Sequence, residues 1–383
     1  MRQHKFFGLL MILASAFLFV QCTSELPEPI QGPPGVDGQN GVDGQDGISG
    51  TASCVSCHNN TLRGEIAAAF ETSQHNDGGF PGGRIGCAQC HDSEGFIDQV
   101  EMGMALGPAG DGSIAYDGTT INCSTCHDMH QTFDFENDGP DYALRLTDGT
   151  QLFLAPSITL DFEGSSNACI SCHQPRDSYP IPALNADGTY VVTSTRFAPH
   201  YGPQSTMLEG VLGAELPGSV VYPAPGDVGV ADGNGHRSLS SCVECHMGDT
   251  SAPDQGGHSF NYVEATCIEC HGAVPGSAQD FSTDMATLLD LLRNVEGVAY
   301  EVDANGDPVF DANGDYIPTT TPVIGIIQAD DPYRTNTGIF SDVAAMAAWN
   351  YTTVYHDQSR GIHNPDYTKA LLKNSIEALL NED

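Results

Sequence analysis

Twelve of the 13 cysteines lie in six copies of one motif, Cys-x-x-Cys-His. The cysteines are Cys54, Cys57, Cys87, Cys90, Cys123, Cys126, Cys169, Cys172, Cys242, Cys245, Cys267 and Cys270. The histidines that follow them are His58, His91, His127, His173, His246 and His271. Two thiols at this spacing can add to the two vinyl groups of one porphyrin, with the adjacent imidazole placed to ligate the iron. The motifs therefore predict six covalently attached haems c.

Other uses of paired cysteines explain the pattern less well. A single Cys-x-x-Cys also fits a redox dithiol or half of a zinc site. Neither of these, nor a disulfide framework, requires a histidine directly after the second cysteine in every copy. Because only Cys22 lies outside the motifs, the sequence favours haem.

The remaining histidines determine whether each iron has a second protein ligand. Of the 14 histidines, those outside the motifs and beyond His4 are His75, His130, His200, His236, His258, His356 and His363. We predict all of these as second axial ligands except His356, which is the spare. His130 lies three residues after His127 and cannot bind the same iron from the same face, so it is expected to reach a neighbouring haem. The assignment of the other histidines to haems stays open, and methionine is the competing ligand.

Three further segments carry a family resemblance: Cys126–His130, His200–Gln204 and Gly361–Tyr367. With the six motifs, they make residues 54 to about 375 similar to exported multihaem c-type cytochromes. The resemblance is to hexahaem members near the outer-surface cytochromes of metal-respiring bacteria. It implies electron transfer outside the cytoplasm. Some relatives polymerise and share a distal histidine between subunits, so a homo-oligomer or filament stays open.

The composition indicates how such a chain would fold. It contains 43 Gly and 23 Pro, with only 8% aromatic residues. We therefore expect little side-chain core, because the macrocycles would supply the apolar surface that folding buries. The predicted fold class is a mostly irregular, haem-cored multihaem cytochrome c with short α-helices and a few small β-hairpins.

Local signals predict where the regular elements lie. Turn dipeptides at 117–118, 148–149 and 187–188 indicate small hairpins, the last one leading into Tyr190-Val191-Val192. Near the C-terminus, apolar periodicity and capping residues indicate three helices. Their expected ranges are 285–295, 341–355 with a Ser341 cap, and 364–379 with Asn364 and Pro365 at the start.

Residues 303–307 nearly repeat at 311–315, as Asp-Ala-Asn-Gly-Asp. Two loops rich in aspartate and asparagine can bind calcium. Two type I′ turns in a hairpin insert would require the same residues. Both interpretations stay open at this point.

The N-terminal residues predict export. Residues 1–21 carry Arg2 and Lys5 before an apolar run, which is typical of a signal peptide. Cys22 follows directly and is predicted to be lipid-modified, although Gln21 departs from the usual small residue. Within residues 22–53, glycine at every third position from Gly32 to Gly50 indicates a collagen-like tether, either extended or a short triple helix. The hexahaem domain would span 54–383, on an outer-membrane lipoprotein at the cell surface or the periplasmic face.

The net charge of the chain limits the classes of partner that it could bind. The formal net charge of −37 disfavours nucleic acid and favours basic redox proteins, other cytochromes or an extracellular acceptor. The first functional hypothesis is an electron carrier rather than an enzyme. The alternative is a reductase of nitrite, hydroxylamine or a sulfur oxyanion with one open haem, where His356, Tyr355 and Arg360 would line the substrate pocket.

Overall fold

The computed structural model divides the chain into two units, Met1–Cys57 and His58–Asp383. It describes residues 54–55, 57–77, 85–102, 118–139, 141–176, 179–226, 235–239, 241–252 and 254–382. The predicted signal peptide (1–21), Cys22 and the tether to residue 53 lie outside these ranges, as does Asp117. The helices and strands described below all lie in the second unit.

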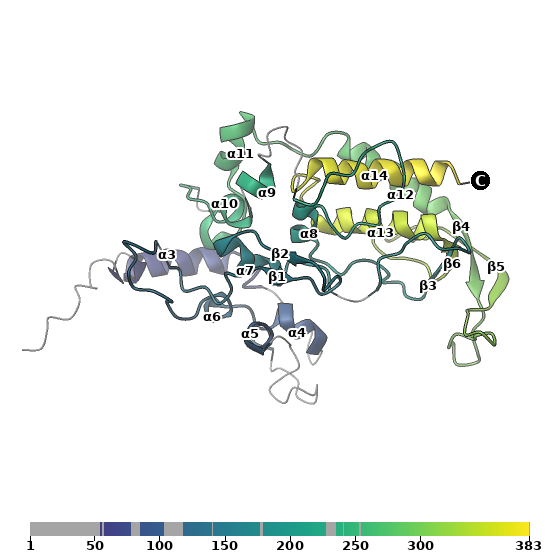
Figure 1. Cartoon of the computed structure of the whole chain (residues 1–383), viewed down its shortest axis with the longest axis horizontal. Helices are drawn as coiled ribbons and strands as arrows, with labels where there is room; N and C mark the ends of the chain where they lie inside the picture. Colours follow the sequence, from purple (N-terminus) through teal and green to yellow (C-terminus); the bar gives the residue numbers. More distant parts are fainter. Residues whose placement is uncertain are drawn as a thin grey trace, which may run out of the picture. The chain divides into compact units, whose positions relative to one another are not determined.

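After the 12-residue helix near its start, helices of ten residues or fewer alternate with irregular chain, and longer helices follow near the C-terminus (Figure 1). The helices are α3 (Asn60–Glu71), α4 (Ile85–His91), α5 (Ser93–Met102), α6 (Cys123–Cys126), α7 (Asn167–Ile170), α8 (Gln204–Glu209), α9 (His236–Leu239), α10 (Cys242–His246), α11 (Glu264–His271), α12 (Phe281–Asn294), α13 (Asp342–Asp357) and α14 (Pro365–Leu380). Two 3₁₀ turns are η1 (Gly164–Ser166) and η2 (Gly257–Ser259). The strands are β1 (Thr150–Gln151), β2 (Thr159–Leu160), β3 (Thr189–Val192), β4 (Glu296–Tyr300), β5 (Pro318–Ile324) and β6 (Gly338–Ser341).

The three predicted C-terminal helices are confirmed as α12, α13 and α14, which lie side by side (Figure 1). The Ser341 side chain accepts a hydrogen bond from the N–H of Ala344, and Asn364 accepts one from Tyr367. These bonds satisfy backbone donors that the first turn of a helix leaves open. The sequence pattern placed the start of α12 at Met285, but the helix begins at Phe281.

A hydrophobic core joins these helices to earlier parts of the chain. Its largest fully buried side chains include Trp349, Tyr367, Phe197 and Phe340. The Trp349 indole N–H donates to the carbonyl oxygen of Leu212 at 3.0 Å, so its polar edge is satisfied. The sequence predicted little side-chain core, but this part of the chain has a well-packed one.

The larger sheet is antiparallel, in the order β3-β6-β4-β5. Tyr190 of β3 pairs with Phe340 of β6, so the strand after Asp187-Gly188 finds its partner far along the chain. The local hairpin predicted there is therefore wrong. A small hairpin does form after Asp148-Gly149, where β1 pairs with β2.

Residues 303–315 form turns between β4 and β5. The N–H of Gly306 donates to the carbonyl of Asp303, and the Asp303 carboxylate accepts from the backbone of Asn305 and Asp307. A type I′ turn needs positive φ at both central residues, whereas Gly306, at the last position, has the positive φ of 89°. The hairpin insert is thus present, but the predicted turn type is wrong.

The helices that carry cysteine motifs differ in burial: α7 buries Ile170 fully, whereas others bury no residue. Helices α10 and α11 have no buried residue, and neither does α3, although nearly all of α13 is buried. Near the third motif, Met129 and Phe133 are 70% and 75% exposed. Helices this short are unstable in water without packing. Helices α10 and α11 would therefore need a covering other than side chains to be stable.

This contrast predicts how the chain behaves without a cofactor. When it is produced without haem attachment, helices α3, α10 and α11, which bury no residue, should exchange backbone amides at nearly unprotected rates. Helices α12–α14 should keep protection, because side chains fill their core. Hydrogen exchange with mass spectrometry measures both regions in one experiment, and equal protection along the chain would contradict the prediction.

Candidate functional site

The structure brings each motif histidine next to one histidine from elsewhere in the chain. We number the pairs by motif order. Five have ring centroids 5.9 to 6.4 Å apart. They are pair 1 (His58 and His130), pair 3 (His127 and His258), pair 4 (His173 and His75), pair 5 (His246 and His363) and pair 6 (His271 and His236).

Pair 2 consists of His91 and His200. Both line one cavity of about 30 Å³ together with Cys87 and Cys90. Burial is the main cause that lowers the pKa of His200 to about 4, and nearby Arg176 and His91 lower it further. The two imidazoles therefore face a shared, poorly solvated space.

The spacing of the rings matches a single metal ion. Metal–imidazole bonds of roughly 2 Å, plus about 1 Å from each nitrogen to its ring centre, put two axial rings about 6 Å apart. Within the described ranges, no group of three or more His, Cys, Asp or Glu side chains is arranged to hold a bare metal ion. Each pair instead offers two imidazoles. A metal bound by the four nitrogens of a macrocycle has two further coordination positions, which two imidazoles could fill.

Hydrogen bonds orient several of these rings. The Nδ1 atoms of His127, His246 and His236 lie 2.8, 2.9 and 2.6 Å from backbone carbonyl oxygens. A carbonyl oxygen only accepts, so Nδ1 must carry the proton. The Nε2 lone pair is then free for a metal, which is the arrangement that metal-ligating histidines adopt.

Pair 4 is held by Gln204. The Nδ1 of His173 lies 3.2 Å from the amide oxygen of Gln204. The amide nitrogen of Gln204 donates to the carbonyl oxygens of His356 and Asp357 at 3.1 and 3.4 Å, which fixes the orientation of the amide. Helix α13 thus positions a motif histidine through one intermediate side chain.

Pair 5 is held by the same end of α13. The Nδ1 of His363 donates to the Asp357 carboxylate at 2.6 Å, and the Asp357 side chain is fully buried. Burial alone would lower the pKa of His363, but the Asp357 charge raises it above its usual value. Neither Asp357 nor Gln204 was among the residues predicted from the sequence. Gln204 lies in a segment that carried the resemblance, whereas no sequence signal marks Asp357.

Cysteines of different motifs also lie close to one another. The thiols of Cys90 and Cys172 are within hydrogen-bonding distance of each other, as are those of Cys169 and Cys242. Burial raises the pKa of Cys126 and Cys245 to about 11, with further contributions from nearby Cys169 and Cys267 respectively. The fourth motif therefore adjoins the second, third and fifth, and the fifth adjoins the sixth.

His356, predicted as the spare, is not within an imidazole pair. Its ring packs against aromatic rings, with the Tyr201 centroid at 4.3 Å and that of Tyr355 at 5.4 Å. Burial lowers its pKa to about 4. The structure thus places the seven non-motif histidines in two environments: six face a motif imidazole and this one faces tyrosines.

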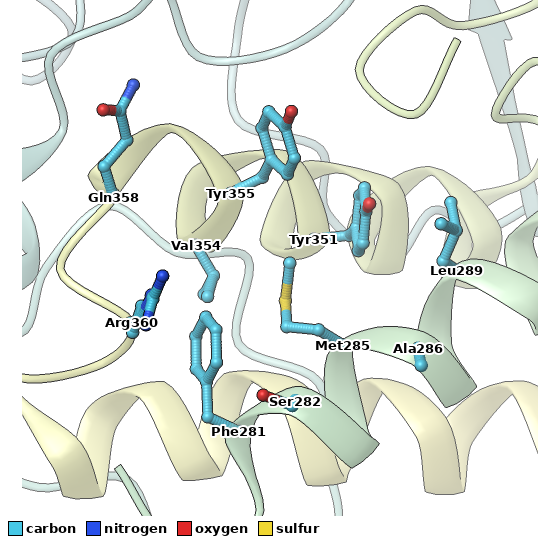
Figure 2. Close-up of a pocket in the computed structure, with 10 residues that line it drawn as sticks. All are labelled: Phe281, Ser282, Met285, Ala286, Leu289, Tyr351, Val354, Tyr355, Gln358 and Arg360. Atoms are coloured by element: carbon cyan, nitrogen blue, oxygen red, sulfur yellow. The ribbon is translucent and has the colours of Figure 1, made fainter. Parts of the chain in front are cut away.

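A separate pocket of about 490 Å³ lies between α12 and α13 (Figure 2). Its lining is mainly apolar, with Phe281, Met285 and Leu289 opposite Tyr351 and Val354. Tyr355 and Arg360, proposed for a substrate pocket in the reductase hypothesis, do line it, but His356 does not. No motif cysteine or paired histidine is among its lining residues.

Comparisons with known proteins add little to this geometry. No protein-family model and no curated protein matches the chain. Among solved structures, the crystal structure of the outer cell wall cytochrome OcwA is similar at a TM-score of 0.41 and 17% identity, over 81% of this chain and 49% of that one. The chain thus spans about half the length of that protein. Within the described part of the chain, no helix has the length and apolarity needed to cross a bilayer.

The buried His356 predicts an acid-sensitive fold. Between pH 6.5 and about 4 the unfolded chain binds a proton at this residue and the folded chain does not. The free energy of unfolding should therefore decrease as the pH is lowered from 6.5 to about 4, by up to roughly 3 kcal/mol from this residue. His356→Phe should reduce this loss of unfolding free energy between pH 7 and pH 4.5. Urea unfolding followed by circular dichroism at the two pH values measures it. An identical loss in both proteins would contradict the prediction.

Proposed function

We propose that the protein is an electron carrier with six haems c, each bound to one cysteine motif and ligated by one of the six histidine pairs. The observation that carries this proposal is the spacing of the rings, 5.9 to 6.4 Å in five pairs. The free Nε2 atoms and the uncovered helices α10 and α11 support it. When bound, the haem supplies a reversible one-electron couple.

The residues of the chain would perform three tasks. The thiols would fix each haem to the backbone, and the two imidazoles of each pair would hold its iron. No iron then has an open position for a small substrate. This ligation favours electron transfer over the reductase hypothesis, which needs one histidine pair to be incomplete.

The neighbouring thiols define a proposed electron path. Cys172 adjoins Cys90, Cys169 adjoins Cys242, and Cys245 lies near Cys267. His130 of pair 1 lies three residues from His127 of pair 3. The order would be 1-3-4-5-6, with site 2 branching from site 4.

The cellular setting is also part of the proposal. Haem attachment at Cys-x-x-Cys-His motifs takes place outside the cytoplasm, which agrees with a signal peptide at 1–21 and lipid on Cys22. The tether at 22–53 would hold the body away from the outer membrane. Partners would be other cytochromes, basic redox proteins or an extracellular acceptor, and a filament of this chain remains an alternative.

The proposal predicts the iron spectrum of single variants. The oxidised protein should carry six low-spin haems by mass spectrometry and electron paramagnetic resonance. His258→Ala should convert one of the six to high spin, because His127 loses its partner imidazole across 6.1 Å.

The matched control is His356→Ala, which removes a buried histidine that faces no other imidazole. It should leave all haems low-spin. A protein whose mass equals that of its amino acids, or a high-spin signal that binds nitrite in the unmodified protein, would refute the proposed function.

The acidic charge predicts a preference among artificial electron acceptors. With a net charge of −37, the reduced protein should react faster with the cation hexaammineruthenium(III) than its driving force alone predicts, and slower with ferricyanide. Stopped-flow rates with both acceptors should converge toward the driving-force values as salt is added, because screening shortens the range of the field to about 3 Å at 1 M. Rates that are independent of salt would contradict the prediction.

A further inference from the structure

Of the interactions around the histidine pairs, one differs in charge from the rest. The Nδ1 partners of His127, His236 and His246 are neutral backbone carbonyls, and that of His173 is the neutral amide of Gln204. The Asp141 carboxylate lies 3.8 Å from the Nδ1 of His130, which is too long for a hydrogen bond. Among the described residues, His363 alone of the paired histidines donates to a carboxylate.

The position of this carboxylate is electrostatically costly. Asp357 is the last residue of α13, where the helix dipole disfavours negative charge, and its side chain has no exposed surface. Two donors offset the cost: the Nδ1–H of His363 at 2.6 Å and the hydroxyl of Ser359. The backbone N–H of His363 in turn donates to Ser359 at 3.2 Å, which closes the loop around the imidazole.

We propose that Asp357 is a positioning residue that makes the haem of site 5 the most negative in reduction potential among the six. The inference rests on the proposed function. A carboxylate on Nδ1 gives the imidazole partial anionic character and makes Nε2 a stronger donor. Stronger donation stabilises Fe(III) relative to Fe(II), so the one-electron reduction of that iron becomes less favourable. The buried setting strengthens the effect, because little solvent screens the charge.

A lower potential at site 5 would affect the proposed electron path. Site 5 connects site 6 to the rest of the proposed chain of haems. An electron crossing it in either direction occupies a state of higher free energy than at its neighbours, so Asp357 limits how fast site 6 exchanges electrons with the other five.

Asp357→Asn tests the inference in the holoprotein. Asparagine keeps an oxygen that accepts from His363 but removes the charge. In a potentiometric titration followed by absorbance, the most negative component, one sixth of the total, should shift to higher potential. One low-spin signal in the paramagnetic resonance spectrum should change its g-values, and all six haems should remain low-spin.

Asp366→Asn is the matched control, because it removes the same charge from an exposed position three residues beyond His363. Its titration should superimpose on that of the unmodified protein. Asp357→Ala adds a second arm: it removes the acceptor altogether and should convert part of one haem to high spin. If Asp357→Asn and Asp366→Asn give the same curve while six haems are present, the inference is wrong and the electron-carrier function stands. If the protein holds no haem, the function itself is wrong.

Discussion

Two imidazole rings about 6 Å apart leave room for one metal ion between their nitrogen atoms and for nothing larger. This spacing recurs in five histidine pairs whose members come from distant parts of the chain, such as His127 with His258 and His246 with His363. Hydrogen bonds to other residues of the chain orient four of these rings. The carbonyls of Tyr142 and Phe260, the amide of Gln204 and the carboxylate of Asp357 each fix one ring. In the proposed protein, each iron would also join two distant segments and so stabilise a chain that has few long elements.

The molecule combines two means of burying apolar surface. Around Trp349 and Tyr367, side chains fill the interior in the ordinary way. Helices α10 and α11 bury no side chain of their own, and we propose that haem faces cover them. The two regions meet at the end of α13. There the His356 carbonyl and the Asp357 side chain hold Gln204 and His363. The well-packed helix therefore provides a rigid support for ligands of two neighbouring sites.

The sequence predicted features that depend on local spacing. The motifs, the number of available histidines and the caps at Ser341 and Asn364 are all encoded within a few residues. The helices that these caps begin are confirmed. Features that depend on long-range packing were not predictable. Nothing near Tyr190 indicates that its strand partner is Phe340, and nothing near Asp357 indicates that it will bind His363. The pairing of His75 with His173 likewise emerges only when chain segments that are far apart pack together.

The contacts of the fourth motif have a consequence for tolerance to damage. Because this motif adjoins the second, third and fifth, the proposed network has three free ends, at sites 1, 2 and 6. Losing site 3 or site 5 would disconnect one end and leave a continuous route between the other two. Losing the haem at Cys169 and Cys172 would separate all three. The protein would thus work as a three-way junction, with a single indispensable centre and three terminal sites.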